Sequence, residues 1–122
     1  MHEEEARAIE TAAPAELGVV AADWAGGFWG VEMDTPFVTP DGRGAIIVML
    51  GSDDDGNVLV EYGDYDRGQY SDDSLEPPLK DTDTAGIVAW LSAEYDRFSN
   101  GGILPEPFAS GMLSIYDDIL GI

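Results

Sequence analysis

The distribution of apolar and polar residues predicts helices near both ends of the chain and strands between them. Residues 3–13 begin with acidic side chains, which the helix dipole favours in a first turn, and Pro14 ends the segment. A second helix is predicted from Thr84, which can serve as its N-cap, to Asn100, which precedes two glycines. Its apolar side chains recur at helical spacing and are Ile87, Trp90, Leu91, Tyr95 and Phe98.

A third helix is predicted in the last part of the sequence. Pro105 and Pro107 keep the residues around them extended, and a helical period of apolar positions follows. These positions are Phe108, Met112, Ile115, Tyr116 and Ile119. We expect the helices to cover one face of a sheet.

Two strands are predicted in the middle of the chain. Residues 45–50 form a continuous apolar run, and residues 58–62 alternate between apolar and polar with a period of two. Asp55-Gly56 lies between them and is a preferred dipeptide of tight hairpin turns. The two segments therefore predict a β-hairpin.

The segment before this hairpin is ambiguous. Residues 19–27 fit either a helix or a strand, and two adjacent glycines interrupt the pattern before residues 28–33, which we interpret as a strand. Asp41-Gly42 offers a second turn, between a strand that ends near Val38 and the strand of the central hairpin. Together these segments predict a meander of about three strands.

The sequence as a whole predicts a single acidic α+β domain over residues 1–122, with a small antiparallel β-meander of about three strands packed against two or three helices. Residues 63–83 are rich in aspartate, show no sustained periodicity and are expected to form a long acidic loop. No stretch approaches the roughly 18 apolar residues of a membrane helix, and the sequence opens on acidic residues where a signal peptide would be basic. We therefore expect a cytoplasmic protein, in the host cytoplasm if the protein is viral.

Charge is the most informative property of the composition. The sequence has 25 Asp+Glu against 5 Lys+Arg, which gives a formal net charge of -20. The few basic residues are scattered, so direct binding to nucleic acid or to an anionic membrane is not expected, because both need clustered positive charge. A basic nucleic-acid-binding protein is the complementary partner.

Candidate metal and catalytic residues are few. With Gly56 at the glycine position of a helix-loop-helix calcium loop, Gly51 would stand at the first ligand and Tyr62 at the bidentate glutamate, so the register excludes that motif. Asp64 and Asp66 could share a divalent ion or divide acid and base roles, but a solvated acidic loop is the better interpretation.

The residue types that most enzymes depend on are scarce as well. The sequence has 0 Cys and 1 His, and it contains no glycine-rich phosphate loop. We expect no metal, no cofactor and no enzymatic activity.

An aromatic cluster surrounds the adjacent glycines of the ambiguous segment. Trp24, Phe28 and Trp29 could form an exposed binding platform, but packing in the core is favoured, because large aromatic side chains dominate the cores of small domains.

Part of the sequence resembles an uncharacterised bacterial domain family of unknown function that occurs in phage and mobile-element proteins. The resemblance runs from Gly30 through Thr35-Pro36-Phe37 to Asp41, and continues over residues 46–48 and 57–64. Tyr62-Gly63-Asp64 stands where the family pattern has two acids and a glycine, which is a departure. The resemblance covers about half of the chain; it implies a mobile-element setting and no catalytic residue.

Three functions fit these observations. The first is a viral or mobile-element inhibitor that occupies the basic groove of a CRISPR or restriction protein as a nucleic-acid mimic. Its candidate partner-binding residues lie on predicted turns and loops and are Asp53, Asp54, Asp55, Asp64, Asp66, Asp72, Asp73 and Glu76. The alternative is a halophilic cytosolic domain whose acidity is an adaptation to salt. An enzyme that uses the Asp64 and Asp66 pair is the weakest of the three.

Overall fold

The computed structural model describes residues 1–38, 45–64, 69–70 and 77–100. Its elements follow the chain in the order α1 (Glu3–Ala12), η1 (Ala15–Leu17), β1 (Val20–Asp23), β2 (Trp29–Val38), β3 (Ala45–Ser52), β4 (Val58–Asp64), β5 (Gln69–Tyr70) and α2 (Thr84–Ser99). The predicted α+β class is confirmed. The predicted third helix and the Asp41-Gly42 turn lie outside the described residues.

The strands form one antiparallel meander, in which each strand pairs with the next one along the chain. Five strands are present among the described residues, where about three were expected. The additional strands are β1, which comes from the ambiguous segment, and the two-residue β5, which lies where only a loop was expected. Both are too short for a period of two to identify them from sequence.

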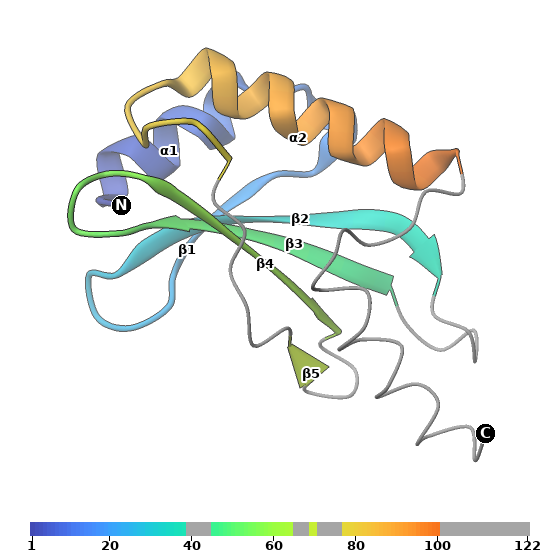
Figure 1. Cartoon of the computed structure of the whole chain (residues 1–122), viewed down its shortest axis with the longest axis horizontal. Coiled ribbons are helices and arrows are strands. Elements are labelled where there is room, and N and C mark those ends of the chain that lie inside the picture. The colour runs from blue at the N-terminus through green and yellow to red at the C-terminus, as the bar shows by residue number, and fades with distance from the viewer. Residues whose placement is uncertain (39–44, 65–68, 71–76, 101–122) are drawn as a thin grey trace.

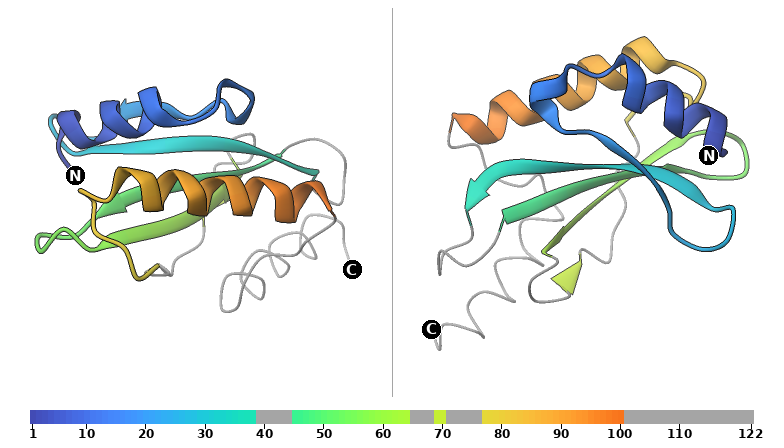
Figure 2. Two further views of the ribbon diagram at one scale, coloured as in Figure 1. Left: turned by 90° about the horizontal axis from the view of Figure 1, so that it is seen from above. Right: turned by 180° about the vertical axis from the view of Figure 1, so that it is seen from behind.

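Helices α1 and α2 pack on the same face of the sheet (Figures 1 and 2). The side chains on this face form the core, because alternate residues of each strand point to the same side. The strands contribute Val31, Met33, Ile46, Val48, Leu50, Val58, Val60 and Tyr62, and the helices contribute Ala6, Ile9, Ile87, Leu91 and Phe98. We call the opposite side, which α1 and α2 do not cover, the outer face.

The helix ends follow the sequence closely, with one correction. Pro14 follows α1 as predicted, after a C-cap at Ala13. In α2 the N-cap is Asp83 and not Thr84, since the Asp83 carboxylate accepts a hydrogen bond of 3.0 Å from the N–H of Gly86. Thr84 is the first helical residue.

One N–H on the β1 edge of the sheet is occupied by a side chain from α1. An edge strand normally presents unpaired N–H groups that invite pairing with another chain. Here the Glu10 carboxylate accepts a hydrogen bond of 2.7 Å from the N–H of Ala21, in the middle of β1. This contact also fixes α1 against the edge strand.

Candidate acidic interaction surface

The hairpin turn between β3 and β4 holds the first three predicted partner-binding residues. Asp54 and Asp55 are exposed, and Gly56 has a φ of 79°. That backbone conformation suits glycine. The N–H of Gly56 donates to the Asp53 carbonyl (3.1 Å), so the predicted hairpin turn is present, with Asp54 and Asp55 as its central residues. The β3–β4 turn thus projects two carboxylates into solvent from a rigid hairpin.

Asp53 differs from its two neighbours because its carboxylate is used inside the turn. One oxygen accepts hydrogen bonds from the N–H groups of Asp55 (3.0 Å) and Asn57 (2.8 Å), and the other accepts from the Asn57 side-chain amide (3.0 Å). The hydrogen bonds from Asn57, more than the nearby charge of Lys80, hold the pKa of Asp53 below its usual value. Asp53 is therefore a turn-forming residue, and the carboxylates of Asp54 and Asp55 are the ones displayed.

The role of Asp53 gives a prediction with a matched control. Asp53→Ala should lower the thermal midpoint, because two turn N–H groups lose their acceptor, whereas Asp54→Ala should leave it almost unchanged. The folded-state pKa of Asp53 is depressed, so its contribution is fully present above the unfolded value near 4 and is lost as the pH falls through the folded value. Thermal melts of both variants over an acidic pH series measure this. Equal midpoints for the two variants at neutral pH would contradict the assignment.

Two further elements bring carboxylates to the same end of the molecule as the β3–β4 turn. Asp81 lies beside the turn, because its N–H donates to the Gly56 carbonyl (2.8 Å) and its carboxylate accepts from the Ser52 hydroxyl (3.0 Å). The start of α1 and the start of α2 lie at this end as well (Figures 1 and 2). We call the resulting group of carboxylates the acidic end; it comprises Glu3, Glu4, Glu5, Asp53, Asp54, Asp55, Asp81 and Asp83.

Among the described residues, each lysine and arginine side chain has a partner within the chain. Arg7 lies 3.2 Å from Glu3 and 3.6 Å from Glu10, and its guanidinium lies over the ring of Trp29. The Lys80 ammonium donates a hydrogen bond of 2.6 Å to the Asn57 side chain. Arg97 is bound by a glutamate, as described below. These positive charges are used locally and form no basic patch.

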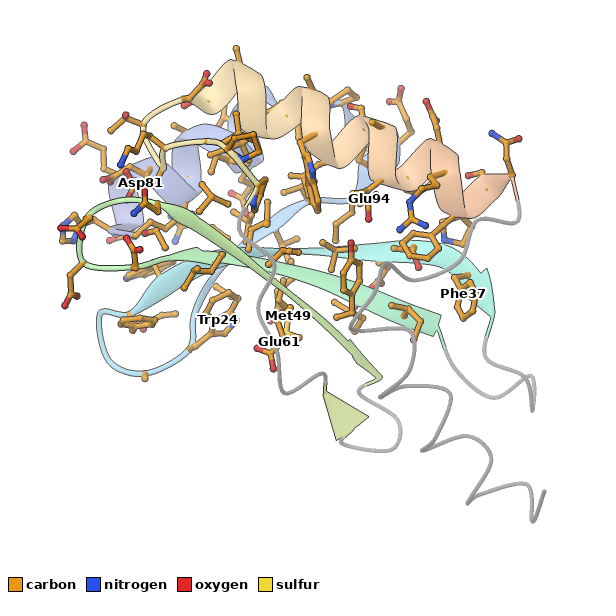
Figure 3. The ribbon with its side chains drawn as sticks, viewed as in Figure 1. Trp24, Phe37, Met49, Glu61, Asp81 and Glu94 are labelled. Atoms are coloured by element: carbon orange, nitrogen blue, oxygen red, sulfur yellow. The ribbon has the colours of Figure 1, made fainter. Side chains whose placement is uncertain are left out.

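A polar network lies buried between α2 and β4. The Glu94 carboxylate accepts hydrogen bonds from the Tyr62 hydroxyl and, in a bidentate pair of 2.8 and 3.0 Å, from Arg97. Tyr62 is completely buried, and Glu94 lies in the core with it (Figure 3 labels Glu94). Burial, together with the hydrogen bond to Glu94, raises the pKa of Tyr62 far above its usual value, so its hydroxyl stays a donor. The network joins helix to sheet.

The remaining predicted residues are only partly placed. Asp64 is the last residue of β4 and pairs with Gln69 of β5. Asp66, Asp72, Asp73 and Glu76 lie outside the described residues, so the proposed pairing of Asp64 with Asp66 stays a prediction. The partner-binding residues predicted from the sequence did not include the acids at the starts of α1 and α2. The sequence contains no local sign that Glu3 to Glu5 lie near the β3–β4 turn, because that proximity depends on the fold.

The expectation that the aromatic cluster packs in the core is right for Trp29 and wrong for the other two residues. Trp29 is partly buried against the core, whereas Trp24 is 39% and Phe28 54% exposed. A run of aromatic residues shows no preference for either face of a sheet until the register is known.

No protein-family model, curated protein or solved structure matches this chain. The resemblance to a mobile-element domain family therefore stays a prediction. Among the described residues, no helix combines the length and the apolar character that a membrane crossing requires. Within the same ranges, no group of three acidic or histidine side chains has an arrangement that could hold a metal ion.

Proposed function

We propose that this protein binds a basic nucleic-acid-binding protein and occupies its groove as a nucleic-acid mimic. The observation that carries the proposal is the net charge of -20 on a chain whose described lysine and arginine side chains all have internal partners. Defence proteins of the CRISPR or restriction type, encountered by a viral or mobile-element protein in the host cytoplasm, are the partner class that we infer. The proposed role is inhibition by occupancy and needs no catalysis.

The acidic end supports this proposal by its construction. Its carboxylates come from two helix starts and a hairpin turn, and hydrogen bonds of Asp81 with Ser52 and Gly56 fix the segment before α2 to the hairpin. Charges held on a rigid frame lose little conformational freedom when a partner binds. A groove that binds successive phosphates is lined by basic side chains, and these can form ion pairs with such fixed carboxylates.

Electrostatic attraction would dominate the encounter with such a partner. Opposite fields of this size speed association and make both the rate and the affinity fall as salt rises. Individual exposed charges contribute little, so several must be changed together to weaken binding measurably.

The experiment is a competition assay with a partner captured from host lysate at the host's own ionic strength. The wild-type protein should displace labelled DNA or RNA from the captured protein. The variant Asp54→Asn/Asp55→Asn/Asp83→Asn should displace it less effectively, because three charges of the acidic end are lost. The matched control, Asp34→Asn/Asp96→Asn/Glu16→Gln, removes the same charge from exposed sites elsewhere. The control should displace the nucleic acid more effectively than the acidic-end variant does.

Two results would count against the proposal. One is simultaneous binding of nucleic acid and this protein without mutual weakening. The other is equal loss for the variant and its control, which would show that net charge acts without a defined surface.

A second candidate function is supported by where the exposed acids lie. They are not confined to the acidic end, since Glu16, Asp34 and Asp96 lie on other elements and are also exposed. This spread is typical of a domain adapted to a salt-rich cytoplasm, in which molar salt screens the repulsion.

The salt-adapted function predicts a strong response of stability to salt. The thermal midpoint should rise markedly between low and molar potassium chloride, because screening removes repulsion within the folded state. A series of melts in potassium chloride measures the response. A thermal midpoint that does not change over this range would exclude the salt-adapted function, and it would not contradict the proposed mimicry of nucleic acid.

A further inference from the structure

Exposed large apolar side chains gather in one hairpin. Among the described residues, those exposed are Val20 (49%), Trp24 (39%) and Phe28 (54%), and all three belong to the β1–β2 hairpin. Single exposed apolar side chains need no explanation, but a group of them with two aromatic rings on one hairpin is typical of a binding surface. We call these three residues the hairpin patch.

The hairpin patch is held in a fixed conformation. The N–H of Trp24 donates to the Phe28 carbonyl (3.1 Å), and the Asp23 carboxylate accepts from the N–H of Gly27 (2.8 Å). Gly26 and Gly27 have φ values of 58° and 101°, which only glycine adopts readily. The tip is therefore an ordered turn that presents its aromatic side chains at low entropic cost.

Trp24 is fixed by its side chain as well. Its indole N–H donates a hydrogen bond of 2.8 Å to Glu32, and its six-membered ring lies over Gly30 and reaches Gly51 on the neighbouring strand. Both glycines leave room for the ring because they have no side chain. Figure 3 shows Trp24, Met49 and Glu61 on the outer face of the sheet, away from the helices.

Carboxylates lie on the same face of the sheet as this aromatic side chain. Val20 lies opposite Glu32 in the sheet, Glu32 lies opposite Met49, and Met49 lies opposite Glu61, so these residues form one row across the outer face. An exposed indole beside carboxylates is a favourable environment for a guanidinium group, which stacks on aromatic rings and binds carboxylates with its planar fork.

Strand addition at this hairpin is disfavoured, since Glu10 already occupies the N–H of Ala21 in the middle of β1. A partner would therefore bind the hairpin patch through side chains.

We infer that the hairpin patch is a second contact surface for the basic partner, at which arginine side chains stack on Trp24 and Phe28. The inference rests on the proposed function and names the chemistry that adds selectivity to the attraction by charge. The acidic end attracts any cation, whereas the hairpin patch discriminates arginine from lysine.

The test uses an oligoarginine and an oligolysine peptide of equal length as probes at low salt. The wild-type protein should bind oligoarginine about two- to fivefold more tightly than oligolysine. Trp24→Ala should abolish this preference, and Trp24→Phe should retain part of it. Phe28→Ala should reduce the preference as well; this side chain is more than half exposed, so its loss leaves folding intact. Calorimetry measures the affinities, and the thermal midpoint checks that each variant is folded.

The matched control separates this inference from the proposed function. Asp54→Asn/Asp55→Asn should weaken both peptides equally and keep the preference for arginine. If that control weakens binding while Phe28→Ala and a folded Trp24→Ala keep the full preference, the hairpin patch is not the arginine site and only this inference is overturned. Equal binding of the two peptides by the wild-type protein would overturn it too. If neither peptide binds the wild-type protein, the proposed function and the inference fall together.

Discussion

Replacing Glu94 with alanine should lower the free energy of unfolding by about 2–4 kcal/mol. The substitution leaves the Tyr62 hydroxyl without its acceptor in a site that is completely buried, and it removes both hydrogen bonds from the Arg97 guanidinium. A buried donor that loses its acceptor costs free energy, because its hydration is not restored, and the loss of the carboxylate that binds the guanidinium adds to this. Arg97 retains some contact with solvent, since its side chain is 32% exposed, which limits the loss.

Urea unfolding at constant salt measures the effect of Glu94→Ala. Glu94→Gln should cost less, because the amide still accepts a hydrogen bond from Tyr62. Tyr62→Phe in the wild-type background should have a modest effect of about 1 kcal/mol. The double variant Glu94→Ala/Tyr62→Phe should be more stable than the sum of the two single changes implies, because the orphaned hydroxyl is gone. Strict additivity would show that the two residues are not coupled.

Gly30→Ala should be considerably more damaging than Gly51→Ala, the same change on the neighbouring strand. A Cβ atom at residue 30 would overlap the Trp24 ring and would lie 2.5 Å from the Leu50 carbonyl oxygen. Backbone cannot give way cheaply, and forced repacking costs about 1–3 kcal/mol. Gly51→Ala is the matched control, because its Cβ would meet only the ring, at 3.2 Å. A small rotation of the indole relieves that contact.

Thermal melts of the two glycine variants measure the difference. Adding Trp24→Ala to Gly30→Ala should recover only part of the stability, since the Leu50 oxygen remains in the way. Equal stability of Gly30→Ala and Gly51→Ala would contradict the crowding at residue 30. If Trp24→Ala recovers none of the stability lost in Gly30→Ala, the Trp24 ring does not lie over Gly30.

The elements that could be predicted from the sequence are those with a repeated pattern. The α2 helix has apolar positions at helical spacing from Ile87 to Phe98. The β3–β4 hairpin has a continuous apolar run in β3, a period of two in β4 and a turn dipeptide between them. By contrast, β1 has four residues and a mixed pattern, and its strand character depends on pairing with β2. Pairing between strands is a long-range property that a local pattern does not contain.

In the candidate sites, too, some residue roles can be predicted from a local pattern and others depend on the fold. Asp53, Asp54 and Asp55 are alike in sequence, and only the turn geometry makes the first a structural acceptor and the others surface charges. Glu94 did leave a signal, since it follows Ile87 and Leu91 at the spacing of the buried stripe of α2. A charged residue at such a position indicates a buried pair. The packing of Trp24 on two glycines from different strands has no such signal in the sequence.

The hydrogen bond from Ala21 to Glu10 bears on how copies of this protein stay separate. At low salt, like charge keeps molecules far apart and makes the edge of β1 irrelevant. In brine that long-range force is screened to a few ångströms, about 3 Å at molar ionic strength, and neighbouring molecules can approach to contact. A carboxylate bound directly to the edge N–H still blocks β1 from pairing at that distance. At the β1 edge this contact hinders pairing with a strand of another molecule, and it acts at short range, where screening by salt does not remove it.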